Sequence, residues 1–140
     1  LGGPSHADEY EAEMKIWGDR IAELAPAVTV TEASLMALLD NQAGLAEGKA
    51  KFEQVCAACH TADGGGLIGP NLCDNYWIHG QGSMLDIHKT VSEGVLEKGM
   101  LAWKNQLDPD LLNNVVAYAY TLKGNTPANP KAPEGNPVQE

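Results

Sequence analysis

Basic residues are scarce in this chain of 140 residues. Nine Lys and Arg stand against 19 Asp and Glu, which gives a formal net charge of −10 at pH 7. Nucleic acids and anionic lipid surfaces attract proteins through basic patches, so this balance argues against both as partners. Long apolar runs are also missing. Stretches such as Leu35–Leu39 are far shorter than the ~20 residues of a membrane span.

Cysteine and aromatic residues are few. Three cysteines, an odd number, exclude a fully paired intrachain disulfide framework. Aromatic residues make up 6% of the chain and include a single Phe, although hydrophobic residues reach 44% in total. The length fits one domain, and we expect something other than aromatic side chains to fill part of its core.

Helical periodicity accounts for most of the chain. It predicts helices over residues 8–25, 31–39, 45–55, 83–92 and 108–122. Pro26 is expected to end the first helix. Trp17 and Ile21 are expected to pack on a neighbour, although a charge-rich helix near a terminus could also stand partly free. No segment shows the sustained alternation of a strand, so the sequence predicts an all-α fold.

Proline gathers at the C-terminus. Four prolines between Gly124 and Pro137 exclude a helix or a central strand. We therefore expect residues 125–140 to form an extended tail that lies on the surface or leaves it. The chain begins at Leu1 without the pattern of a leader peptide, so any targeting or anchoring segment is expected outside these residues.

The string Cys56-Ala57-Ala58-Cys59-His60 is the attachment pattern of c-type haem. Two thiols one helical turn apart can form thioethers with the two vinyl groups on one porphyrin edge. His60 can then give a ring nitrogen to the iron. A redox disulfide or half of a zinc site are the alternatives. No second cysteine pair and no β-α-β pattern supports them, so we expect one haem c, attached through Cys56 and Cys59.

The sixth ligand of the iron is expected further along the chain. Met100 follows Gly99 in a loop, from which a thioether can face the iron without disrupting a helix. Met84, at the start of a helix, is the alternative. Met14 and Met36 lie in segments whose periodicity uses them for packing. The sequence therefore predicts His60 and Met100 as the two metal ligands.

A glycine-rich run precedes Pro70. No strand precedes it and no Gly-Lys-Ser/Thr follows, which disfavours a phosphate-binding loop. A ligating histidine usually donates its second ring N–H to a carbonyl, and we expect that of Pro70 to accept it. Trp77 and Trp103 are expected to wall the haem and to donate to a propionate, although plain core packing would need the same residues.

Together these motifs resemble the class I cytochrome c family. The pattern comprises an early helix with Gly48 and Phe52, the haem motif, Gly-Pro-Asn-Leu at 69–72, the Met loop and a last helix with Tyr118. The resemblance implies that the early and last helices cross at Gly48 and that Phe52 stacks there with Tyr118. It also implies helices arranged around one covalently bound haem, here with an extra N-terminal helix and the proline-rich tail.

One branch of the family matches further. Residues 69–80, Gly-Pro-Asn-Leu-Cys-Asp-Asn-Tyr-Trp-Ile-His-Gly, look like the Gly-Pro-Asn-Leu-Thr-Asp-x-Tyr-Trp-x-His-Gly stretch of the haem-c subunit of cbb3-type cytochrome c oxidases, the CcoP/FixP type. Residues 98–103 resemble its Met loop. Cys73 stands where Thr is typical and Leu101 where Pro is usual. That subunit often has two haem c domains and a membrane helix, whereas this chain has one haem motif.

The resemblance implies an organisation and a role. Residues 1–40 would be an acidic helical extension, a stalk from a membrane anchor, followed by a cytochrome c domain over 41–124 and the tail over 125–140. The domain would pass single electrons from a cytochrome donor towards the catalytic subunit of the oxidase, without being an enzyme by itself. It would lie in a bacterial periplasm, tethered to the inner membrane through a segment outside this chain. A free-standing periplasmic carrier is the alternative. A haem enzyme or gas sensor with an open distal side is the rival from another class.

Overall fold

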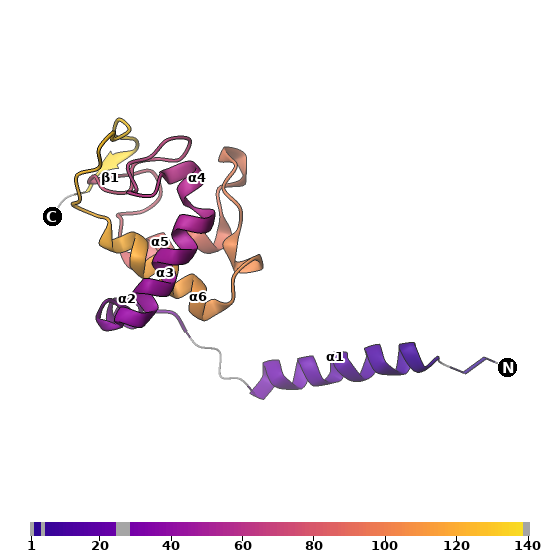
Figure 1. Ribbon diagram of the computed structural model, residues 1–140. Helices are drawn as coiled ribbons and strands as arrows, with labels where there is room; N and C mark the ends of the chain where they lie inside the picture. The colour runs from indigo at the N-terminus through magenta and orange to yellow at the C-terminus, as the bar shows by residue number, and fades with distance from the viewer. Residues whose placement is uncertain (1, 4, 25–28, 139–140) are drawn as a thin grey trace.

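The computed structural model describes residues 2–3, 5–24 and 29–138. Helices dominate the chain (Figure 1). They are α1 (His6–Leu24), α2 (Glu32–Met36), η1 (Ala37–Asp40), α3 (Gln42–Val55), α4 (Ala57–His60), α5 (Met84–Glu93), η2 (Leu96–Lys98), η3 (Trp103–Asn105) and α6 (Pro109–Thr121). Two short strands, β1 (Tyr76–Trp77) and β2 (Asn136–Pro137), pair antiparallel. The predicted helices are present, and the strand pair is a small departure from an all-α fold.

The helix starts follow the sequence signals. The side chains of Thr31, Ser83 and Asp108 each accept a hydrogen bond from a backbone N–H in the first turn, at 3.1, 3.1 and 3.0 Å. Such a side chain satisfies an N–H that has no partner within the helix. Asn41 does the same for α3 by accepting from Gly44, which is why that helix begins at Gln42 and not at residue 45.

The crossing of α3 and α6 forms the centre of the fold. At Gly48 the two backbones approach so closely that an added Cβ would collide with the carbonyl oxygen of Asn114. One turn further along, the ring of Phe52 meets the ring of Tyr118 edge-on, with centroids 5.4 Å apart. The expected crossing at Gly48 and the Phe52–Tyr118 pair are thereby confirmed.

Residues 30–40 pack on the helices around this crossing and form one packed body with them. The side chain of Leu35 is 1% exposed and lies against Met84 and Ala117. The carboxylate of Glu32 accepts hydrogen bonds from the backbone N–H groups of Met84 and Leu85, at 3.1 and 2.7 Å. It thereby caps the N-terminus of α5 from a distant part of the sequence. The packed body therefore starts before residue 41.

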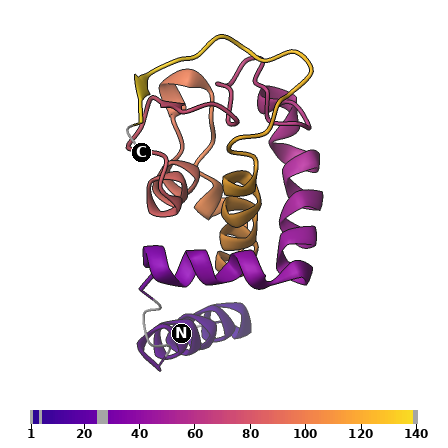
Figure 2. The same cartoon turned by 90° about the vertical axis from the view of Figure 1, so that its left-hand side faces the viewer.

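Helix α1 stands apart from this body (Figures 1 and 2). The side chains of Tyr10, Met14 and Trp17 are more than half exposed, and α1 contacts no other described helix or strand. The expectation that Trp17 packs on a neighbour is wrong, and the stated alternative of a free helix describes it. The side chain of Ile21 and the predicted helix end at Ala25 and Pro26 lie outside the described residues. No helix in the described ranges is long and apolar enough to cross a membrane.

The C-terminal segment runs back over the domain (Figure 2). Strand β2 pairs Asn136 with Trp77 and Pro137 with Tyr76, and the N–H of Val138 donates to the carbonyl of Asn75 at 2.8 Å. Two residues per strand are too few to show alternation in a sequence. Pro137 is tolerated because a two-stranded ribbon has only edges.

Candidate functional site

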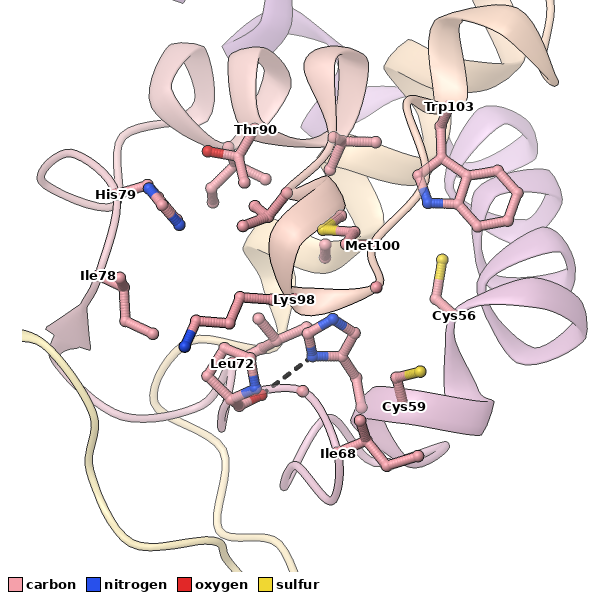
Figure 3. Close-up of a pocket in the computed structure, with 18 of the residues that line it drawn as sticks. Cys56, Cys59, Ile68, Leu72, Ile78, His79, Thr90, Lys98, Met100 and Trp103 are labelled. Atoms are coloured by element: carbon pink, nitrogen blue, oxygen red, sulfur yellow. Dashed lines mark hydrogen bonds between the residues drawn. The ribbon is translucent and has the colours of Figure 1, made fainter.

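A single cavity collects the residues that the sequence singled out. Its volume of about 850 Å³ is within the range of about 300–1,000 Å³ that ligand sites span. Its walls come from α3 to α6, the loops between them and the C-terminal segment (Figure 3). All seven predicted site residues line it, namely Cys56, Cys59, His60, Pro70, Trp77, Met100 and Trp103.

The two cysteines lie where α3 passes into α4. Cys56 is the residue between the two helices, and Cys59 and His60 complete the single turn of α4. Burial, with a smaller contribution from the neighbouring Cys59, raises the pKa of the Cys56 thiol to about 11. Reactive redox thiols have a lowered pKa. Within the described residues, no group of three or more His, Cys, Asp or Glu could hold a metal ion. The redox-disulfide and zinc alternatives thus find no support.

The ring of His60 is held in one orientation. Its Nδ1 lies 3.0 Å from the carbonyl oxygen of Pro70, which confirms the predicted acceptor. A carbonyl can only accept, so Nδ1 carries the proton and Nε2 keeps a free lone pair for a metal. Burial lowers the pKa of His60, which favours the neutral imidazole. Gly69 lies against the ring so closely that an added Cβ would be 2.6 Å from Cε1.

Met100 lines the cavity from a loop whose two ends, Val95 and Met100, are joined by backbone hydrogen bonds (Figure 3). The N–H of Val95 donates to its carbonyl at 3.0 Å, and its own N–H donates back to Val95 at 3.1 Å. Of the four methionines, all described, only Met100 lines the cavity. Met84, the alternative, is fully buried beside Leu35 and Ala117 and does not line the cavity.

Trp77 and Trp103 each border both the cavity and a buried apolar cluster. Both line the cavity, and both also pack against the buried cluster of Ile87, Leu112 and Val116. The indole N–H of Trp77 is buried and has no hydrogen-bond partner among the described residues. That nitrogen lies against Gly82, where an added Cβ would be 2.5 Å from it, and Gly82 does not line the cavity.

Among the cavity residues that the sequence analysis missed are two from the C-terminal segment. Lys131 and Glu134 of the C-terminal segment both line the cavity, and their side chains meet at 2.8 Å. Composition alone marked this segment as a proline-rich tail. The only sequence signal was a pair of opposite charges three residues apart between prolines, which does not indicate where the pair lies.

The residues present fit haem c. Two thiols with the attachment spacing, an imidazole with a free Nε2 and a thioether all border one cavity whose remaining wall is mainly apolar. These are the donor types that hold haem in His/Met-ligated cytochromes c. Cys73 does not belong to this set. It is 5% exposed and its thiol donates to the carbonyl of Asp63 at 3.2 Å.

Comparisons with known proteins agree with this donor set. A family model described as "Cytochrome C oxidase, cbb3-type, subunit III" matches residues 43–118. The FixP subunit of the cbb3-type oxidase of Azorhizobium caulinodans is 37% identical over 99 residues, which are 64% of this chain and 33% of that protein. FixP of Rhizobium meliloti is 31% identical over 131 residues, 87% of this chain and 44% of that protein. The chain therefore spans a third to less than half of the length of these relatives.

A solved structure supports the fold independently. Cytochrome CL from Methylophaga aminisulfidivorans superposes with a TM-score of 0.54, covering 70% of this chain and 72% of its own, at 18% sequence identity. At that identity the likeness shows the fold alone, which is that of a cytochrome c. With the family match over more than half of its residues, the chain belongs to the cbb3-type subunit III family, as a class I cytochrome c domain of the CcoP/FixP type.

Proposed function

We propose that this chain is a monohaem c-type cytochrome domain that transfers single electrons in a respiratory chain, as the haem-c domain of a cbb3-type cytochrome c oxidase. One observation carries the proposal. Cys56, Cys59 and His60 on one side and Met100, 40 residues further along, line the same cavity. Membership of the cbb3 subunit III family supports the role in an oxidase.

The predicted site residues would each have a part in holding the haem. The thiols of Cys56 and Cys59 would form the two thioethers, and His60 Nε2 and the Met100 thioether would be the axial donors. The Pro70 carbonyl fixes the His60 ring through Nδ1. Trp77 and Trp103 would form walls of the haem site. Haem supplies a one-electron couple.

The protein around the site sets how that couple behaves. A mainly apolar lining keeps water away, and a thioether donor stabilises the ferrous state, which raises the reduction potential. If His60 and Met100 both bound the iron, they would leave no position open to a substrate. The domain by itself would then conduct electrons and would not catalyse bond chemistry.

The expected surroundings follow from the family. A cytochrome donor would deliver electrons and the catalytic subunit of the oxidase would receive them, in the small and transient contacts usual for redox encounters. The domain would lie in a bacterial periplasm, tethered to the inner membrane. The proposed organisation is an extension over 1–40, the cytochrome domain over 41–124 and the tail over 125–140. The burial of Leu35 shows that the packed body also includes the end of the extension.

Carbon monoxide tests the proposal against the rival of an open-site haem protein. The full chain is produced with haem, and the pyridine haemochrome spectrum of the purified protein counts covalently attached haem per chain. The reduced protein is then exposed to carbon monoxide. We expect one haem c per chain and little or no binding of carbon monoxide, because the Met100 thioether would already bind the iron. Rapid and complete binding would contradict the His/Met assignment.

A further inference from the structure

The C-terminal segment fastens the loop that orients His60. We call residues 65–71 the proximal loop. The N–H of Lys131 donates to the carbonyl of Gly65 at 2.8 Å, and the carbonyl of Lys131 accepts from the side chain of Asn71 at 3.3 Å. Asn71 is 7% exposed. One residue of the tail thus ties both ends of the loop from which Pro70 reaches His60.

The side chain of Lys131 continues along the same loop. Its ammonium donates to the carbonyl of Ile68 at 3.3 Å and pairs with the carboxylate of Glu134 at 2.8 Å. The side chains are 29% and 37% exposed, and both residues line the cavity. Two opposite charges therefore stand at the wall of the site, on the side of His60. Partial burial reduces their screening by salt.

We propose that Lys131 and Glu134 are positioning residues that tune the reduction potential of the centre held by His60, with Lys131 raising it and Glu134 lowering it. This inference rests on the proposed function. A nearby positive charge favours the state that has gained an electron, and a nearby negative charge favours the state that has lost one.

Paired neutral variants separate a charge effect from a merely structural one. Lys131→Gln and Glu134→Gln break the same ion pair, and both keep the backbone hydrogen bonds of residue 131. If the pair only stabilised the fold, the two variants would shift the potential in the same direction. The proposal predicts shifts of opposite sign, downward for Lys131→Gln and upward for Glu134→Gln, both shrinking as the ionic strength rises. Lys131→Arg keeps the charge and is expected to leave the potential unchanged.

The measurement is a dye-mediated potentiometric titration of the full holoprotein, followed by haem absorbance. Lys49 and Glu53 provide the matched control, because they form an exposed ion pair at 3.9 Å and do not line the cavity. Lys49→Gln and Glu53→Gln are expected to give smaller shifts than the tail variants. Shifts of the same sign in the two tail variants, or no shift in either, would overturn the proposal.

The same preparation shows which of the two proposals fails. If the unaltered chain carries no covalent haem, or binds carbon monoxide completely, the proposed function is wrong whatever the tail does. If it carries one haem and excludes carbon monoxide, but the potentials of the tail variants do not move in opposite directions, only the tuning role of Lys131 and Glu134 is wrong.

Discussion

At the scale of single residues, the imidazole of His60 has one ring nitrogen in a hydrogen bond and the other available to a metal. The carbonyl oxygen of Pro70 accepts a hydrogen bond from Nδ1 at 3.0 Å and Gly69 lies against the ring, so rotation of the His60 side chain is restricted. A ligand fixed in this way loses little conformational entropy when it binds a metal. Nε2 is the atom that the local structure leaves for this purpose.

Replacing Met100 tests the second axial donor. We expect Met100→Ala to lose the weak near-infrared sulfur-to-iron band of the oxidised protein and to bind carbon monoxide when reduced, because the thioether is removed from the cavity. Met36→Ala is the matched control, since Met36 lies outside the cavity and is 38% exposed. Absorbance spectra of both holoproteins measure the near-infrared band and the binding of carbon monoxide. A band that survives in Met100→Ala would assign the ligand to another residue.

The site residues differ in how far the sequence could predict them. Cys56, Cys59 and His60 are contiguous, so their geometry depends on one helical turn and is visible in the motif. Pro70 is ten residues from His60 and was found through the general need of a ligating imidazole for an acceptor. Lys131 is held at the cavity by contacts with residues 60 and 63 positions away, and Glu134 pairs with Lys131. No local pattern encodes such a contact.

At the scale of elements, the crossing of α3 and α6 depends on a missing side chain. We expect Gly48→Ala to lower the free energy of unfolding by about 1–3 kcal/mol, the usual cost of overpacking a core, because the new methyl group would meet the Asn114 carbonyl. Urea unfolding followed by haem absorbance measures it.

Gly18→Ala controls for the change of residue type. Gly18 also lies within a helix, but an added Cβ there meets nothing within 4 Å. We expect this variant to leave the unfolding of the domain unchanged. Equal effects of Gly48→Ala and Gly18→Ala would mean that the close approach of the two helices does not constrain the fold.

Helices were predictable here because their signals are local. Periodicity and capping residues located the five longer helical segments to within a few residues, whereas the short helices α4, η2 and η3 were not predicted. The links between helices were not predictable in this way. Glu32 caps α5 over a separation of more than 50 residues, and β1 pairs with a strand 60 residues away. Both depend on the assembled tertiary structure.

At the scale of the whole molecule, the N-terminal region divides into two parts with different roles in stability. Removing residues 1–28 is expected to leave the free energy of unfolding unchanged, because α1 contacts no other described helix or strand. Removing residues 1–40 is expected to lower it by more than about 2 kcal/mol, since the burial of Leu35 is lost.

Urea unfolding of both truncated holoproteins, compared with the full chain, measures this difference. Leu35→Ala in the full chain serves as a second measurement if the shorter protein does not accumulate. Equal stability of the two truncated proteins would contradict a body that begins before residue 41. A loss of stability on removing residues 1–28 would show that α1 contributes to it.

The position of the tail at the end of the chain also affects the order in which contacts around the site form. The cysteines and His60 leave the ribosome some 70 residues before Lys131, and contacts between such distant residues form late in folding. During synthesis the proximal loop therefore lacks the hydrogen bonds that tie Gly65 and Asn71 to the tail. Lys131 and Glu134 line the cavity only once the tail lies on the proximal loop, so one of the last segments to be synthesised completes this part of the wall.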